Sequence, residues 1–86
     1  MNLIKLDNIE HKSLVGCLIN IPSLTDPNEI IDSFVVLTIC LNSGGAILSV
    51  LCDGEFQYRW ITYCERGYIA STDGFKAIGL DKYGKI

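Results

Sequence analysis

The clearest pattern in the chain is a pair of apolar, strand-like runs on either side of Asp53-Gly54. Residues 46–52 and 55–64 are rich in β-branched and aromatic side chains, which are typical of strands. Asp-Gly between two such runs predicts a two-residue hairpin loop, because a type I′ turn needs positive φ at both central residues. We therefore expect these two runs to pair as antiparallel strands.

A second Asp-Gly pair lies at Asp73-Gly74, between residues 67–72 and residues 75–80. The same reasoning predicts a hairpin there, and Glu65-Arg66-Gly67 supplies a turn that would link it to the first hairpin. The second half of the chain is thus expected to form a meander of four strands.

The first hairpin also predicts which side chains share a face. A two-residue loop at positions 53–54 places Val50 opposite Gln57 and Leu48 opposite Arg59, on one face of the sheet. The other face then holds a largely apolar and aromatic set, which we expect to form the core: Ile47, Leu51, Phe56, Tyr58 and Trp60, continued by Thr62, Cys64, Tyr68, Ala70, Thr72, Phe75 and Ala77. If Trp60 lies in this core, Trp60→Ala should lower the free energy of unfolding by about 3–5 kcal/mol, as for other buried large aromatic residues.

The segment from Leu24 to Asn42 is ambiguous between helix and strand. Asp26-Pro27 is typical of a helix start, and a helical stripe follows, so we favour a helix from Pro27 into residues 34–37. The rival is a buried strand, which the β-branched residues between positions 35 and 39 favour. Before this segment, residues 13–21 indicate a strand that ends at Pro22, and Leu3–Leu6 a short edge strand.

Together these elements predict one domain over residues 1–86 of the α+β class. We expect an antiparallel β-meander of four to five strands with one helix packed on a face. The alternative is an all-β, barrel-like domain in which residues 33–41 also form a strand. The tail, residues 81–86, is expected to fray.

Composition narrows the classes of partner. The chain has a net charge of −3, and such a chain lacks the cationic surface that drives nucleic-acid binding. Residues 34–52 carry no charge, but Asn42-Ser43-Gly44-Gly45 interrupts them with a turn, so we expect no membrane span. The start of the chain lacks a basic leader, which favours a cytoplasmic protein.

Residues that could carry chemistry are few. The four cysteines, Cys17, Cys40, Cys52 and Cys64, lack the close spacing of a zinc or redox motif, so we expect reduced, structural thiols and no metal. His11 is the only histidine and lies in a polar stretch. No phosphate-binding loop is present. We therefore predict no catalytic residue and no cofactor.

A contact surface is the remaining prediction. Arg and Tyr on a half-apolar sheet face are typical of protein interfaces. We therefore predict that a partner binds to the face formed by Gln57, Arg59, Ile61 and Tyr63. We expect a small intracellular protein-binding module, such as a stoichiometric inhibitor or immunity-type protein from a phage or mobile element, for example an anti-CRISPR. The alternatives are a homo-oligomeric scaffold subunit and a small cysteine-dependent enzyme.

Overall fold

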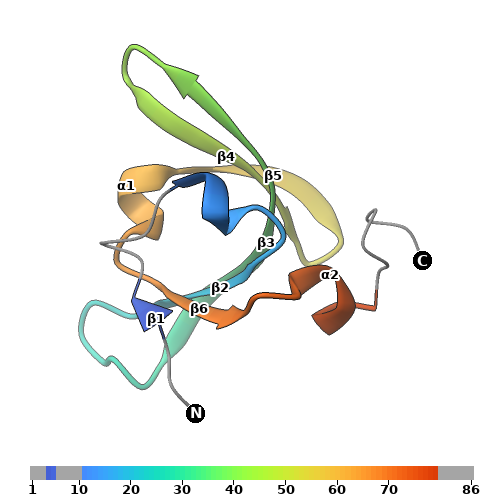
Figure 1. Cartoon of the computed structure of the whole chain (residues 1–86). Coiled ribbons are helices and arrows are strands. Elements are labelled where there is room, and N and C mark those ends of the chain that lie inside the picture. Colours follow the sequence, from blue (N-terminus) through green and yellow to red (C-terminus); the bar gives the residue numbers. More distant parts are fainter. Residues whose placement is uncertain (1–3, 6–10, 80–86) are drawn as a thin grey trace.

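The fold is an open, six-stranded antiparallel sheet with short helical turns, of the α+β class (Figure 1). The computed structural model describes residues 4–5 and 11–79. The strand order is β1-β6-β2-β3-β4-β5. The strands are β1 (Ile4–Lys5), β2 (Leu18–Pro22), β3 (Ile30–Asn42), β4 (Gly45–Cys52), β5 (Glu55–Trp60) and β6 (Tyr68–Ser71). The helical turns are η2 (His11–Leu14), α1 (Ile61–Cys64) and α2 (Gly74–Ala77).

A meander of four strands is present, but it consists of β2 to β5 and not of the four strands predicted in the second half. After β5 the chain turns through α1 and returns to the other side of β2, where β6 pairs antiparallel with it. Figure 1 shows α1 at the left of the view, making this connection between β5 and β6. The predicted strand over residues 55–64 therefore ends at Trp60.

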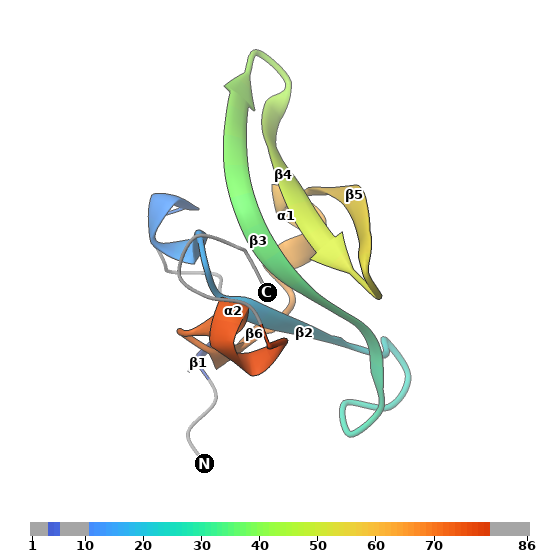
Figure 2. The same cartoon turned by 90° about the vertical axis from the view of Figure 1, so that its right-hand side faces the viewer.

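Strand β3 joins the two halves of the sheet. Its Val35 lies opposite Leu18 of β2 on one side and opposite Leu51 of β4 on the other. Beyond this point the register with β4 shifts between Val36 and Thr38. In Figure 2 the strand bends, and its far end projects with β4 beyond the rest of the molecule. The bend places Phe34, Val35 and Val36 all in buried positions.

This bend explains why the predicted helix over residues 27–37 is wrong. Three successive buried residues in a curved strand break the two-residue alternation, and the resulting apolar spacing resembles a helical stripe. The Asp26 side chain accepts a hydrogen bond from the Asn28 amide at 3.0 Å, as a helix cap would, but here it stabilises a turn that leads into β3. The rival prediction of a strand is correct, but only Phe34, Val35 and Val36 of this strand are buried.

The hairpin at Asp53-Gly54 is confirmed. Both residues have positive φ, 51° and 78°, as a type I′ turn requires. Cys52 lies opposite Glu55, and the predicted pairs Val50–Gln57 and Leu48–Arg59 are present.

The hairpin predicted at Asp73-Gly74 is wrong, because α2 begins there. The Asp73 side chain caps this turn by accepting from the Lys76 amide at 3.2 Å. Gly74 lies against the backbone of Gly16, to which it donates at 2.7 Å, and an added Cβ would come within 2.7 Å of that carbonyl oxygen. Glycine is required here for close packing and not for a turn.

The face predicted as core is also wrong: the sheet buries the other side of β4 and β5. The core contains Ala46, Leu48, Val50 and Cys52 of β4, together with Phe34, Ile61 and Cys64. By contrast Phe56, Tyr58 and Trp60 are exposed, at 82%, 73% and 53% of their surface. Of the predicted core set, Cys64 is buried, while Thr62, Thr72 and Ala77 are exposed.

Three further expectations concern the ends of the chain. The strand predicted over residues 13–21 begins later, at Leu18, because residues 11–14 form η2. The short edge strand predicted at Leu3–Leu6 is present as Ile4–Lys5, at the edge beside β6. The fraying predicted for residues 81–86 lies outside the described residues. Within the described part of the chain, every helix is too short to cross a bilayer.

The inverted faces reverse the expectation for Trp60. Phe34 is 1% exposed, so Phe34→Ala should lower the free energy of unfolding by about 3–5 kcal/mol. Trp60 is half exposed and opposite Ile47, so Trp60→Ala should cost only about 1 kcal/mol, the scale of a cross-strand pair. Urea denaturation of both variants checks this. A loss for Trp60→Ala as large as for Phe34→Ala would contradict the assignment of faces.

Candidate functional site

Three large aromatic side chains lie exposed along one strand. Phe56, Tyr58 and Trp60, here called the aromatic strip, occupy alternate positions of β5 and so point to the same side of the sheet. The largest exposed apolar patch of a protein is often a functional surface. The strip is therefore the first candidate for a functional surface.

An open groove of about 440 Å³ lies beside the strip. Tyr58 and Trp60 form one side of it, and Ile47 and Ser49 of β4 lie opposite them in register. Cys40 of β3, opposite Ile47, extends the surface to a third strand. The groove is a concave extension of the strip across β5, β4 and β3.

The strip also lies at an edge of the sheet. β5 is the last strand in the order, and among the described elements its extensive contacts are with β4 and α1. A strand in this position presents unpaired backbone amides and carbonyls to which another strand can add. The site thus combines an apolar face with a hydrogen-bonding edge.

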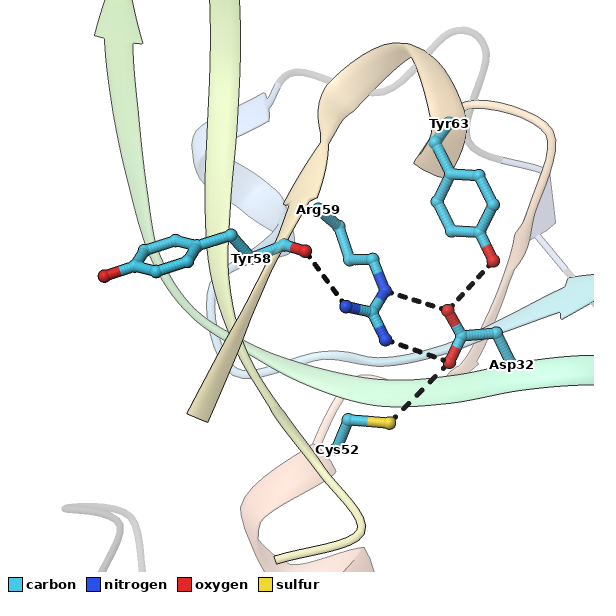
Figure 3. A network of polar contacts seen from close by, with 5 residues as sticks. All are labelled: Asp32, Cys52, Tyr58, Arg59 and Tyr63. Atoms are coloured by element: carbon cyan, nitrogen blue, oxygen red, sulfur yellow. Dashed lines mark hydrogen bonds and ion pairs between the residues drawn. The ribbon is translucent and has the colours of Figure 1, made fainter. Parts of the chain in front are cut away.

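A polar network on the opposite side of β5 fixes the orientation of the strip. Arg59 donates to the Asp32 carboxylate through Nε at 2.9 Å, and the Tyr63 hydroxyl donates to the same carboxylate at 2.9 Å. Cys52 adds a weaker sulfur contact with Asp32 at 3.7 Å. Figure 3 shows the Tyr58 ring projecting away from this group while Arg59 turns toward Asp32.

The network also reaches the edge of the sheet. Arg59 Nη1 donates to the backbone carbonyl of Tyr58 at 2.9 Å, so the guanidinium bridges Asp32 and the open side of β5 (Figure 3). The guanidinium carbon lies 5.5 Å from the centre of the Phe34 ring, which supports it by a cation–π contact. Arg59 is therefore both a core-facing group and a cap on one edge carbonyl.

The electrostatics of the network favour a charged carboxylate and a neutral phenol. Burial acts to raise the pKa of Asp32, but the hydrogen bonds from Arg59 and Tyr63 and the charge of Arg59 outweigh it and lower that pKa. For Tyr63, burial and its hydrogen bond to Asp32 raise the pKa to about 12. At neutral pH the network therefore consists of an ion pair between Arg59 and Asp32, with the neutral Tyr63 hydroxyl donating to the same carboxylate.

The structure places the predicted contact residues on this inner side. Ile61 is in the core, while Arg59 and Tyr63 are held by Asp32. Gln57 is partly buried opposite Val50. The sequence interpretation missed the aromatic strip because it assigned the strip to the interior. One signal was available in β4, where Ser49 shares its face with Ile47 and Leu51 while the other face is uniformly apolar.

The cysteines do not assemble a reactive centre. Burial raises the pKa of Cys17 and Cys52 and brings that of Cys64 to about 12, so these three thiols stay protonated at neutral pH. Cys40 is exposed, and all four cysteines are free thiols. In the part of the chain that the structure describes, no cluster of three or more metal-binding side chains occurs.

Comparison with known proteins gives no family assignment. No protein-family model, no curated protein sequence and no solved structure matches the chain.

The cysteine environments predict a graded reactivity. In the native protein, iodoacetamide should modify Cys40 first, because it is exposed, while Cys17, Cys52 and Cys64 react only after unfolding. Mass spectrometry of timed digests measures each site, and Cys40→Ser should remove the fast phase. Rapid modification of Cys52 or Cys64 in the folded protein would contradict the burial described here.

The Asp32 network predicts a specific acid sensitivity. Because the native pKa of Asp32 is lowered from 3.8, its contribution is fully present above that value and is lost as pH falls through the native pKa. Asp32→Asn should therefore lower the free energy of unfolding by about 1.5–3 kcal/mol near pH 7, the range for hydrogen bonds to charged groups, and by progressively less below about pH 4.

Urea denaturation at several pH values measures this difference. Tyr63→Phe is the matched control, since it removes one hydrogen bond to Asp32 but keeps the ion pair with Arg59. This control should retain the acid dependence of the natural protein. A constant gap between Asp32→Asn and the natural protein from neutral to acidic pH would show that the ion pair does not act as described.

Proposed function

We propose that this chain is a protein-binding module that contacts its partner through the aromatic strip and the free edge of β5. The observation that carries the proposal is the exposure of Phe56, Tyr58 and Trp60 in alternate positions of one edge strand. Tyr and Trp supply much of the binding energy in protein interfaces, because each buries a large area with few rotatable bonds. Backbone groups at the edge add the directional hydrogen bonds of strand addition.

Charge favours a protein over a nucleic acid as the partner. Aromatic side chains on a strand can stack bases, but such sites lie in positively charged grooves. Here the neighbouring charged residues are the exposed Asp53 and Glu55, and Arg59, whose charge is paired with Asp32. A phosphate backbone would meet acidic groups at the start of β5.

A cysteine-dependent enzyme has less support than a binding role. The three buried thiols have raised pKa values, and a thiolate is the species that acts as a nucleophile. The narrower roles that composition suggests, an inhibitor or an immunity-type protein, depend on the identity of the partner and stay predictions.

Site-specific photo-crosslinking in cells of the source organism tests the proposal. A benzophenone amino acid at position 58 should give discrete cross-linked protein species, because Tyr58 lies at the centre of the strip. The matched control is the same amino acid at Leu24, which is 84% exposed but lies in the loop between β2 and β3. Equal cross-linking from positions 58 and 24, or none from position 58, would overturn the assignment of the site.

A further inference from the structure

The hairpin geometry determines which backbone groups of β5 point away from β4. Paired residues of antiparallel strands alternate between hydrogen-bonded and non-hydrogen-bonded pairs, and Cys52–Glu55 closes the two-residue loop as a hydrogen-bonded pair. Phe56, Tyr58 and Trp60 therefore turn their amides and carbonyls away from β4. The hydrogen bond from Arg59 to the Tyr58 carbonyl agrees with this, since that carbonyl is open to a side chain.

The sequence of the edge is symmetric about Tyr58. Aromatic residues occupy positions 56, 58 and 60, and polar residues occupy positions 57 and 59 between them. An antiparallel copy of the same strand, centred on Tyr58, would therefore place aromatic opposite aromatic and polar opposite polar. The backbone groups that point away from β4 would also match, because they belong to the even-numbered residues in both copies. The Trp60 carbonyl is already the N-cap acceptor of α1 and would accept a second hydrogen bond.

We propose that the molecule that adds to this edge is a second copy of the chain, with β5 paired antiparallel to β5 and Tyr58 on the two-fold axis. In this register Phe56 faces the partner's Trp60, and each Tyr58 exchanges backbone hydrogen bonds with the partner's Tyr58. The inference rests on the proposed function, since it names the partner of the same site.

Charge allows this register. Arg59 lies opposite the partner's Gln57, which leaves the two Arg59 residues as diagonal neighbours about 7–8 Å apart. Each Arg59 charge stays paired with Asp32 of its own chain, which offsets the repulsion between them. The two copies of Glu55 are six residues apart along the paired strands, about 20 Å at the usual rise per residue, which exceeds the screening length of about 8 Å at physiological salt. The cap by Arg59 is also compatible, because a carbonyl oxygen can accept a second hydrogen bond.

The rest of the sheet limits assembly to two chains. The pairing uses the same edge in both copies, so it closes on itself and does not propagate. Among the described residues, the opposite edge is β1 with two residues, which is a short template for another strand.

The size of the contact predicts a weak dimer. The strip exposes on the order of 400 Å² per copy, taking about 150–250 Å² for a whole aromatic side chain. Edge pairing covers part of this together with the backbone, which places the interface near or below the ~1,000 Å² of stable complexes. We therefore expect a dimer that forms as concentration rises and dissociates on dilution.

Sedimentation equilibrium tests the dimer. From micromolar to millimolar concentration the apparent mass should rise from 9.5 kDa toward twice that value. Tyr58→Lys places two cations at the axis and should keep the protein at the mass of one chain, whereas Leu24→Lys should behave as the natural protein. A constant mass of one chain throughout, or an equal effect of both substitutions, would overturn the proposal.

Disulfide cross-linking tests the register, in a Cys40→Ser background that removes the exposed natural thiol. Under mild oxidation Tyr58→Cys alone should form a covalent dimer. Phe56→Cys should form one efficiently only when mixed with Trp60→Cys copies. Equally fast cross-linking of Phe56→Cys alone and of Leu24→Cys would indicate random collision and would contradict the two-fold pairing.

The outcomes separate this inference from the proposed function. A chain that stays monomeric yet cross-links to a different protein through position 58 overturns the dimer and retains the binding site. A monomeric chain that cross-links to nothing through position 58 overturns both.

Discussion

The ion pair between Arg59 and Asp32 decides which side of β5 meets the core. Alternation along a strand means that one side chain held inward places its neighbours outward. Because Arg59 is tied to Asp32 on β3 and Tyr63 on α1 supports the same carboxylate, Tyr58 and Trp60 face the other way. The surface proposed to bind a protein is thus a consequence of a polar contact on its reverse side.

This contact also links elements that are distant in the sequence. Asp32 lies near the start of β3, where that strand pairs with β2, whereas Arg59 lies on β5 at the far edge of the meander. An ion pair between them therefore crosses the curl of the sheet and holds its two halves over the apolar core. Cys52 and Phe34 complete the surroundings of the pair.

The conformation of a local turn could be predicted from the sequence, whereas contacts between residues distant in the sequence could not. Asp53-Gly54 determined a hairpin and its register, because only a few residue pairs adopt positive φ at two successive positions. At positions 73–74 the same residue pair has another use: Asp73 caps α2, and Gly74 allows close contact with the backbone of Gly16. Local sequence cannot distinguish these two uses of glycine.

The choice of face failed for a related reason. Three aromatic residues on one side of β5 outweigh Gln57 and Arg59 in any count of hydrophobicity, so the pattern alone favours burying them. Burying Arg59 becomes favourable only with a carboxylate partner, and Asp32 lies 27 residues earlier in the chain. The curvature of β3 was hidden in the same way, because its three successive buried residues resembled a helical stripe.

Acrylamide quenching of tryptophan fluorescence tests the orientation of β5 most directly, because Trp60 is the only tryptophan in the chain. In dilute, folded protein, a half-exposed Trp60 should give red-shifted emission and be quenched readily by acrylamide. Blue-shifted emission protected from acrylamide would place Trp60 in the interior and would contradict the outward orientation of the aromatic strip.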